Sequence, residues 1–264
     1  MNVLDRIILH KRKEVSDRKR AVGINVLEQS SFFSRPTVSM KAGVTAFEAS
    51  GIIAEFKRRS PSKGIINGQA SVEETTVGYA RAGASALSVL TDEEFFGGSN
   101  DDLSRARRLN HCPILRKDFT IDEYQIVEAK SIGADAILLI AAVLDARKSK
   151  ELASFAHSLG LEVLLEVHNE EELMSNIDAG ADLIGVNNRD LKTFAVSTET
   201  SKKLAPLIPP GVVKVSESGI SSPDTIAELR NYGYQGFLIG ENFMKDRHPH
   251  VSAADFIRKM KMGS

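Results

Sequence analysis

The sequence has one cysteine, no long apolar run and almost no net charge, and each shortage argues against a class of protein. Cys112 has no second cysteine with which to form an intrachain disulfide, which fits a reducing compartment. No apolar stretch approaches the ~20 residues that span a bilayer, and no signal-peptide core is present. We therefore expect a soluble protein of the cytoplasm that is not inserted in a membrane.

Charge and motifs exclude further classes. Lys and Arg total 34 and Asp and Glu total 35, so no overall positive field attracts nucleic acid. The chain has no HExxH pair, no glycine-rich phosphate loop and no dinucleotide fingerprint. We expect no nucleic-acid partner, no metal ion and no cofactor, and any anionic ligand must be bound locally.

What the sequence does contain is an internal repeat in which a helical pattern ends at a glycine and a short apolar run follows. A glycine at that point predicts a left-handed helix cap. The repeat occurs at Gly83, Gly133, Gly160, Gly180 and Gly233. Three further apolar runs, at 52–57, 112–117 and 211–217, bring the number of predicted strands to eight.

These runs are almost continuously apolar, which is typical of parallel strands covered on both faces. Eight strands alternating with helices in a chain of 264 residues predict an α/β fold, the (β/α)8 TIM barrel. A doubly wound open sheet stays possible, because periodicity does not show closure. We expect one domain over residues 1–264.

Residues 1–46 precede the repeat and are predicted to form an N-terminal helical extension, with its clearest helix at 4–20. The basic residues of this helix are expected to form a solvated face, as Glu14 and Asp17 among them suggest. Its apolar residues Leu4, Ile7 and Ile8 need a surface to bury. We therefore expect the helix to cover the barrel mouth.

Charged and amide residues lie at the ends of the predicted strands. Side chains of a barrel strand alternate inward and outward, and the C-terminal strand ends carry the active site. Residues with inward parity at these ends are Glu55, Lys57, Lys117, Glu166, Asn187 and Glu217. Apart from Asn187 they come from alternate strands, which predicts that they form a layer of charged side chains at the mouth of the barrel. The alternative is that these charges only form salt bridges that close the barrel.

A phosphate site is predicted beside this layer. Barrels of this kind often bind phosphate through the loops after strands seven and eight, using backbone N–H groups. The residues at these positions are Ser218, Gly219, Gly240 and Glu241, and Ser60 adds a hydroxyl donor. Phe96, Phe119 and Leu138 are predicted to form an apolar wall of the site. His168 is expected to be a solvated loop residue.

Seven segments at the predicted strand ends are, in chain order, IIAEFKRRSPSKG, LTDEEFFGGS, PILRKDF, LLEVHN, GVNNRDLKTF, VSESGI and LIGENFM. Together they resemble the strand-end motifs of the indole-3-glycerol-phosphate synthases, over nearly the whole chain. The resemblance implies a carboxy-lyase of tryptophan biosynthesis, which converts 1-(2-carboxyphenylamino)-1-deoxyribulose 5-phosphate into indole-3-glycerol phosphate, carbon dioxide and water.

The resemblance also implies roles. Lys117 would be the general acid on the ribulose carbonyl oxygen, with Glu166 acting on the same oxygen. Glu55 and Lys57 would serve the later proton removal and dehydration, and Asn187 and Glu217 would support them. Arg189 would lie near the anthranilate carboxylate. Glu241 would offer its backbone N–H to the phosphate and turn its side chain away, since two anions repel.

Other functions stay open. A phosphoribosylanthranilate isomerase would need a Cys/Asp pair at strand ends, and a pentose-phosphate epimerase would need a His/Asp metal cluster; the sequence offers neither. A non-catalytic barrel used for binding would be expected to have lost part of the charged layer. We expect a monomer that acts on a small phosphosugar–anthranilate substrate.

Overall fold

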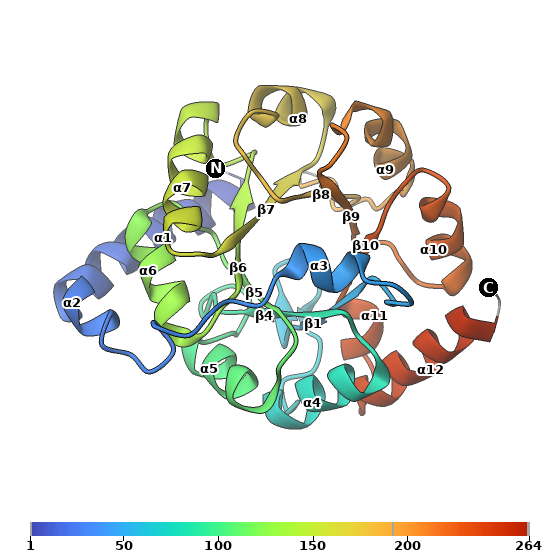
Figure 1. Cartoon of the computed structure of the whole chain (residues 1–264), viewed down its shortest axis with the longest axis horizontal. Coiled ribbons are helices and arrows are strands. Elements are labelled where there is room, and N and C mark those ends of the chain that lie inside the picture. Colours follow the sequence, from blue (N-terminus) through green and yellow to red (C-terminus); the bar gives the residue numbers. More distant parts are fainter. Residues whose placement is uncertain (1, 192, 263–264) are drawn as a thin grey trace.

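The computed structural model describes residues 2–191 and 193–262, in which eight parallel strands close into a barrel ringed by helices (Figure 1). In the order of their neighbours the strands are β1 (Ile52–Phe56), β10 (Gly236–Ile239), β9 (Val213–Glu217), β8 (Leu183–Asn187), β7 (Glu162–Val167), β6 (Ala136–Ile140), β5 (Ile114–Lys117) and β4 (Ala86–Leu90). Because β4 also pairs with β1, the sheet closes. The predicted barrel is confirmed and the open sheet is wrong.

The helices follow the strands on the outside of the barrel (Figure 1). They are α4 (Val72–Ala82), α5 (Asn100–Leu109), α6 (Glu123–Ile132), α7 (Ala146–Ser158), α8 (Glu170–Asn176), α9 (Glu199–Leu204) with a 3-10 turn at Ala205–Leu207, α10 (Pro223–Arg230), α11 (Glu241–Met244) and α12 (Pro249–Met262). The five glycines predicted to end helices all have positive φ, between 74° and 98°. The left-handed cap is confirmed at Gly83, Gly133, Gly160 and Gly233, whose backbone N–H groups bond back to the end of the helix. Gly180 lies four residues beyond Asn176, the last residue of α8, and is not its cap.

Alternation along each strand divides the core in two. In β6, Ile137 and Leu139 pack in the large cluster between sheet and helices, while Ala136, Leu138 and Ile140 belong to the cluster inside the barrel. The same alternation directs the last inward side chain of each strand into the mouth.

A short helix, α3 (Met40–Thr45), lies across the opposite opening of the barrel, at the start of the strands (Figure 1). Met40 and Val44 join the inner cluster, and Glu162 at the start of β7 accepts the backbone N–H of Met40 at 2.7 Å. This part of the N-terminal extension therefore fills the bottom of the barrel.

Met40→Ala is expected to lower the free energy of unfolding by about 2–5 kcal/mol, because it leaves a cavity where a fully buried side chain stood. Urea denaturation measures the loss, and Met174→Ala, at a residue that is 51% exposed, is the control. Turnover should stay near wild type, because α3 lies at the far end from the mouth. A loss below about 1 kcal/mol would contradict the role of Met40 in filling the bottom of the barrel.

The predicted N-terminal helix is confirmed as α1 (Val3–Ala21), followed by α2 (Ile24–Leu27). It begins with a capping box between Asn2 and Asp5. The expectation of a solvated basic face holds for most of this helix, where Arg12, Lys13, Lys19 and Arg20 are exposed, but it is wrong for Lys11, which is completely buried. Its ammonium is paired with carboxylates of the barrel, a contact between distant segments that local sequence does not encode.

Candidate active site

The C-terminal ends of the strands enclose a cavity of about 660 Å³. Every residue predicted for the site lines it, namely Glu55, Lys57, Ser60, Phe96, Lys117, Phe119, Leu138, Glu166, Asn187, Arg189, Glu217, Ser218, Gly219, Gly240 and Glu241. Leu4 and Ile7 of α1 also line it. A short antiparallel hairpin, β2 (Arg59–Ser60) with β3 (Gly64–Ile65), follows β1 and brings Ser60 to the rim.

Lys117 lies at the centre of the charged layer. Its Nζ is 2.6 Å from Glu166 Oε2 and 3.1 Å from Glu217 Oε2. Burial alone would lower the pKa of this lysine, but the carboxylates of Glu166, Glu217 and Glu55 outweigh it and raise the pKa above its ordinary value. Lys117 is therefore an ammonium at neutral pH, which can donate a proton but not accept one.

The two carboxylates beside Lys117 differ in their environments. Burial raises the pKa of Glu217 to about 7; Lys117 opposes this rise, and Glu166 and Glu55 add to it. Burial acts in the same direction on Glu166, but Lys117 and His168 hold its pKa well below the usual range. The first proton that this pair binds therefore lies on Glu217.

The free energy of unfolding is expected to fall as the pH rises through about 7, because the pKa of Glu217 is about 7 in the folded chain and 4.5 ordinarily. The folded state keeps a proton that the unfolded chain has lost, so this contribution is complete below about pH 4.5 and is lost above pH 7. Thermal melts from about pH 5 to pH 8 measure the slope. Glu217→Gln should flatten the slope between about pH 5 and 6.5; above this range the raised pKa of His168 also makes the stability fall as the pH rises. An identical slope in the variant would contradict the assignment.

Glu55 and Lys57 form a second pair, with Lys57 Nζ 2.6 Å from Glu55 Oε1. The hydroxyl of Ser88, the inward residue of β4 beside Glu55, donates to Glu55 Oε2 at 3.4 Å. A Cβ at Gly240 would lie 2.5 Å from Glu55 Oε1. The glycine after β10 therefore leaves the space that this carboxylate occupies.

His168 is not the solvated loop residue that the sequence suggested. Its side chain is 8% exposed, with Nδ1 3.0 Å from Glu172 Oε2 and Nε2 3.3 Å from Glu166 Oε1. Burial lowers the pKa of this histidine, but the two carboxylates outweigh burial and raise the pKa to about 10. His168 is thus a second cation beside Glu166. The spacing of four residues between His168 and Glu172 was the signal that sequence reasoning missed.

The predicted anion end lies after β9 and β10. Ser218 and Gly219 both have positive φ, 66° and 75°, so two successive residues turn the backbone in the left-handed region. Gly240 directly precedes α11, whose first N–H groups have no partner within the helix. The Glu241 carboxylate is 3.1 Å from Arg189 Nη2 and 3.3 Å from Lys63 Nζ. Sequence reasoning missed Lys63.

The apolar end is formed by Phe96, Phe119 and Leu138, which the cavity lining brings together. The rings of Phe96 and Phe119 have centroids 5.9 Å apart. Leu4 and Ile7 of α1 add to this lining. These side chains give the cavity an apolar surface against which an aromatic ring can pack.

Within residues 2–191 and 193–262 no group of three or more His, Cys, Asp or Glu side chains is placed to hold a metal ion. None of the helices in this described part of the chain is long and apolar enough to cross a membrane. The charged groups that line the cavity are lysines, an arginine and carboxylates.

Comparison with known proteins decides the family. A family model described as Indole-3-glycerol phosphate synthase matches residues 4–256. The chain belongs to the indole-3-glycerol phosphate synthase family. An indole-3-glycerol phosphate synthase of Bacteroides thetaiotaomicron is 51% identical over 260 residues, which cover 98% of this chain and 99% of the relative. One of Caldanaerobacter subterraneus subsp. tengcongensis is 41% identical over 267 residues, 99% of this chain and 100% of the relative.

Solved structures outside the indole-3-glycerol phosphate synthase family share the fold. A chain of the tryptophan synthase a2b2 complex from Pyrococcus furiosus has a TM-score of 0.60 at 15% identity and covers 83% of this chain and 100% of that chain. A second solved structure, described as "Native KDPGal structure", has a TM-score of 0.57 at 14% identity. The match covers 83% of this chain and 94% of that chain. At such identities the likeness concerns the fold alone.

Proposed function

We propose that the cavity at the strand ends is the active site in which this chain carries out the indole-3-glycerol phosphate synthase reaction. The substrate, 1-(2-carboxyphenylamino)-1-deoxyribulose 5-phosphate, closes its pyrrole ring and loses carbon dioxide and water. The observation that carries the proposal is the Lys117 ammonium, held between Glu166 and Glu217 in a cavity with one apolar and one anion-binding end.

Lys117 is the acid of ring closure. The aromatic carbon that bears the carboxylate attacks the ketone carbon, the carbonyl electron pair moves to oxygen, and Lys117 gives that oxygen a proton. A positioned donor for a developing oxyanion contributes about 10²–10³-fold in rate. Glu166 keeps the ammonium in place, because His168 and Lys117 together keep this carboxylate ionised.

Loss of carbon dioxide then returns the electron pair of the breaking carbon–carbon bond to the ring. Dehydration follows, in which a proton leaves the carbon next to nitrogen and the hydroxyl departs as water. We assign the proton transfers of this step to Glu55 and Lys57, which already share a hydrogen-bonded ion pair. Asn187 and Glu217 support the substrate hydroxyls and the lysines.

The ends of the substrate are assigned to the ends of the cavity. The Ser60 hydroxyl and the backbone N–H groups of Ser218, Gly219, Gly240 and Glu241 bind the phosphate, while the anthranilate ring packs against Phe96, Phe119 and Leu138. Arg189 pairs with the anthranilate carboxylate and must leave Glu241 to do so. The Glu241 carboxylate stays turned toward Lys63, away from the phosphate.

Three further properties belong to this proposal. The chain is one domain over residues 1–264 with the 1–46 segment as its extension, it works as a monomer, and it resides in the cytoplasm. The packing of α3 into the bottom of the barrel supports the single domain, because the extension shares the inner core. Light scattering of the purified chain at assay concentration tests the monomer, and a dimer mass would contradict it.

The function is tested by supplying the carboxyphenylamino-deoxyribulose phosphate without metal or nucleotide and following indole fluorescence. The chain contains no tryptophan, so no indole of the protein adds to the signal. Steady formation of indole-3-glycerol phosphate is the expected result. Wild-type protein that forms none would overturn the proposed function.

A further inference from the structure

A buried cluster of charges lies directly behind the apolar end of the cavity, and its centre is a lysine of α1. Lys11 is completely buried. Its Nζ is 2.9 Å from Glu14 Oε2, 2.9 Å from Asp92 Oδ2 and 2.9 Å from Asp118 Oδ1. A buried ammonium without partners is strongly unfavourable, so this helix can dock only where these carboxylates receive it.

The two aspartates also hold the backbone of the aromatic wall. Asp92 Oδ1 accepts the N–H groups of Phe95 at 2.8 Å and Phe96 at 3.2 Å. Asp118 Oδ1 accepts the N–H of Phe119 at 2.8 Å. The carboxylates that bind Lys11 therefore fix the loop after β4 and the end of β5, from which Phe96 and Phe119 enter the cavity.

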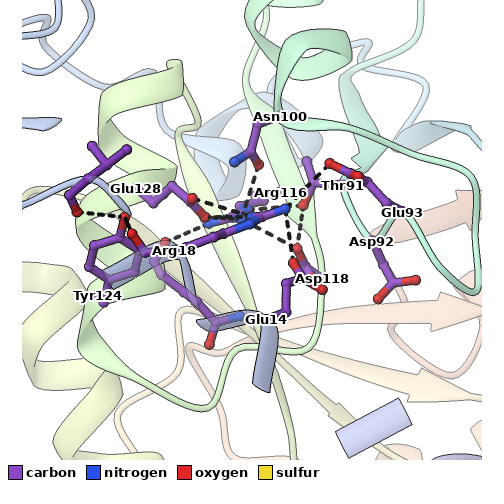
Figure 2. Close-up of polar contacts among 12 residues, drawn as sticks. Glu14, Arg18, Thr91, Asp92, Glu93, Asn100, Arg116, Asp118, Tyr124 and Glu128 are labelled. Atoms are coloured by element: carbon purple, nitrogen blue, oxygen red, sulfur yellow. Dashed lines mark hydrogen bonds and ion pairs between the residues drawn. The ribbon is translucent and has the colours of Figure 1, made fainter. Parts of the chain in front are cut away.

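A second set of contacts joins the same elements. Figure 2 shows Arg116 at the centre of this set, between Asp118 and Glu128; its Nη2 is 3.4 Å from Asp118 Oδ2 and 2.5 Å from Glu128 Oε2. Thr91 donates to Asp118 Oδ2 at 2.6 Å. Arg18 of α1 reaches Glu128 at 3.1 Å. The helix is thus tied to β5 directly through Lys11 and indirectly through Glu128.

We propose that Lys11 is a positioning residue for the aromatic ring of the substrate, because its ammonium links α1 to the two strand ends that carry Phe96 and Phe119. It acts through these two residues and not on the reacting atoms. With the link in place, Leu4 and Ile7 close the apolar end over the ring. This inference rests on the proposed function for the identity of the ring.

Lys11→Met tests the link, since methionine keeps an apolar stem and removes the charge. KM is expected to rise about tenfold and kcat to change by less than about threefold, because ground-state and transition-state binding of the ring are lost together. Lys19→Met is the matched control on the same helix. Lys19 is exposed and pairs with the single carboxylate of Asp122, so its replacement should leave KM within about twofold of wild type.

A second variant separates positioning from simple destabilisation. Lys11→Met leaves Asp92 without its cation, and Asp92→Asn in the same chain removes that uncompensated charge while its side-chain oxygen still accepts the N–H groups of Phe95 and Phe96. The double variant should regain most of the lost melting temperature but keep the raised KM. Recovery of KM together with the melting temperature would overturn the proposal.

Amide hydrogen exchange gives a readout that needs no substrate. Exchange in α1 should speed up in Lys11→Met and stay near wild type in Lys19→Met. An unchanged exchange rate of the α1 amides in Lys11→Met would overturn the link between α1 and the two strand ends. Wild-type turnover with an unchanged KM in Lys11→Met would overturn only the positioning role, whereas a wild type without turnover would overturn the proposed function.

Discussion

Lys117→Met is expected to lower kcat/KM by about 10³-fold or more while the barrel stays folded. The variant loses the proton donor for the carbonyl oxygen and the positive charge that stabilises it, and one such donor contributes about 10²–10³-fold. The Glu166 and Glu217 carboxylates are left without the ammonium that both contact. Because the pKa of Glu217 is already about 7, proton uptake relieves part of this repulsion and the fold survives.

The indole fluorescence assay measures the loss, with circular dichroism as the check on folding. Lys214→Met is the matched control, because Lys214 is also a strand lysine but donates to the carbonyl of Ala205 at 2.7 Å on the helical side of β9. The control should keep near-wild-type kcat/KM. A folded Lys117→Met protein with more than about a tenth of wild-type activity would remove Lys117 from the role of general acid.

Gly185→Ala is expected to reduce kcat/KM by about 10²-fold without changing any charged group. Gly185 lies in β8 between Glu166 of β7 and Val215 of β9, and a Cβ there would lie 2.2 Å from Glu217 Oε1. The carboxylate must therefore leave the position in which its Oε2 contacts Lys117. Displacement of a catalytic group by about 1 Å costs rates of this order.

The same assay and a thermal melt measure both consequences of Gly185→Ala. Gly68→Ala is the control, since the nearest atom to its added Cβ is a side-chain carbon of Ile65 at 3.4 Å, an ordinary contact. We expect the control to be as active as wild type. Full activity in Gly185→Ala would show that Glu217 does not need its position beside Lys117.

The barrel and its mouth could be predicted from the sequence because both follow from short-range periodicity. A glycine after each helical segment and eight apolar runs are enough to indicate the repeat, and a period of two along a strand assigns Glu55 and Lys57 to the same side. Parallel strands place their C-terminal ends at one rim. Hence strand periodicity alone assigns Lys117 and Glu217, which are 100 residues apart, to the same cavity.

Two charged residues that were expected in solvent are buried. His168 was expected in solvent and is buried between two carboxylates. Lys11 was expected on a solvated face and is buried against Asp92 and Asp118. Both partners of His168 lie within four residues of it in the sequence, but only the fold buries the three side chains together. The burial of Lys11 depends on Asp92 and Asp118, which distant segments supply.

The sequence by itself determined the eight alternating strands and helices, the family and which side chains face the mouth, since strand periodicity and motif order are local properties of the chain; closure of the sheet was shown by the pairing of β1 with β4. Only the tertiary structure decided which of two neighbouring glutamates holds a proton, which glycine makes room for a carboxylate and where the N-terminal helix docks. These depend on desolvation and on distances of a few ångströms between segments far apart in the chain, and electrostatic energies change steeply over such distances.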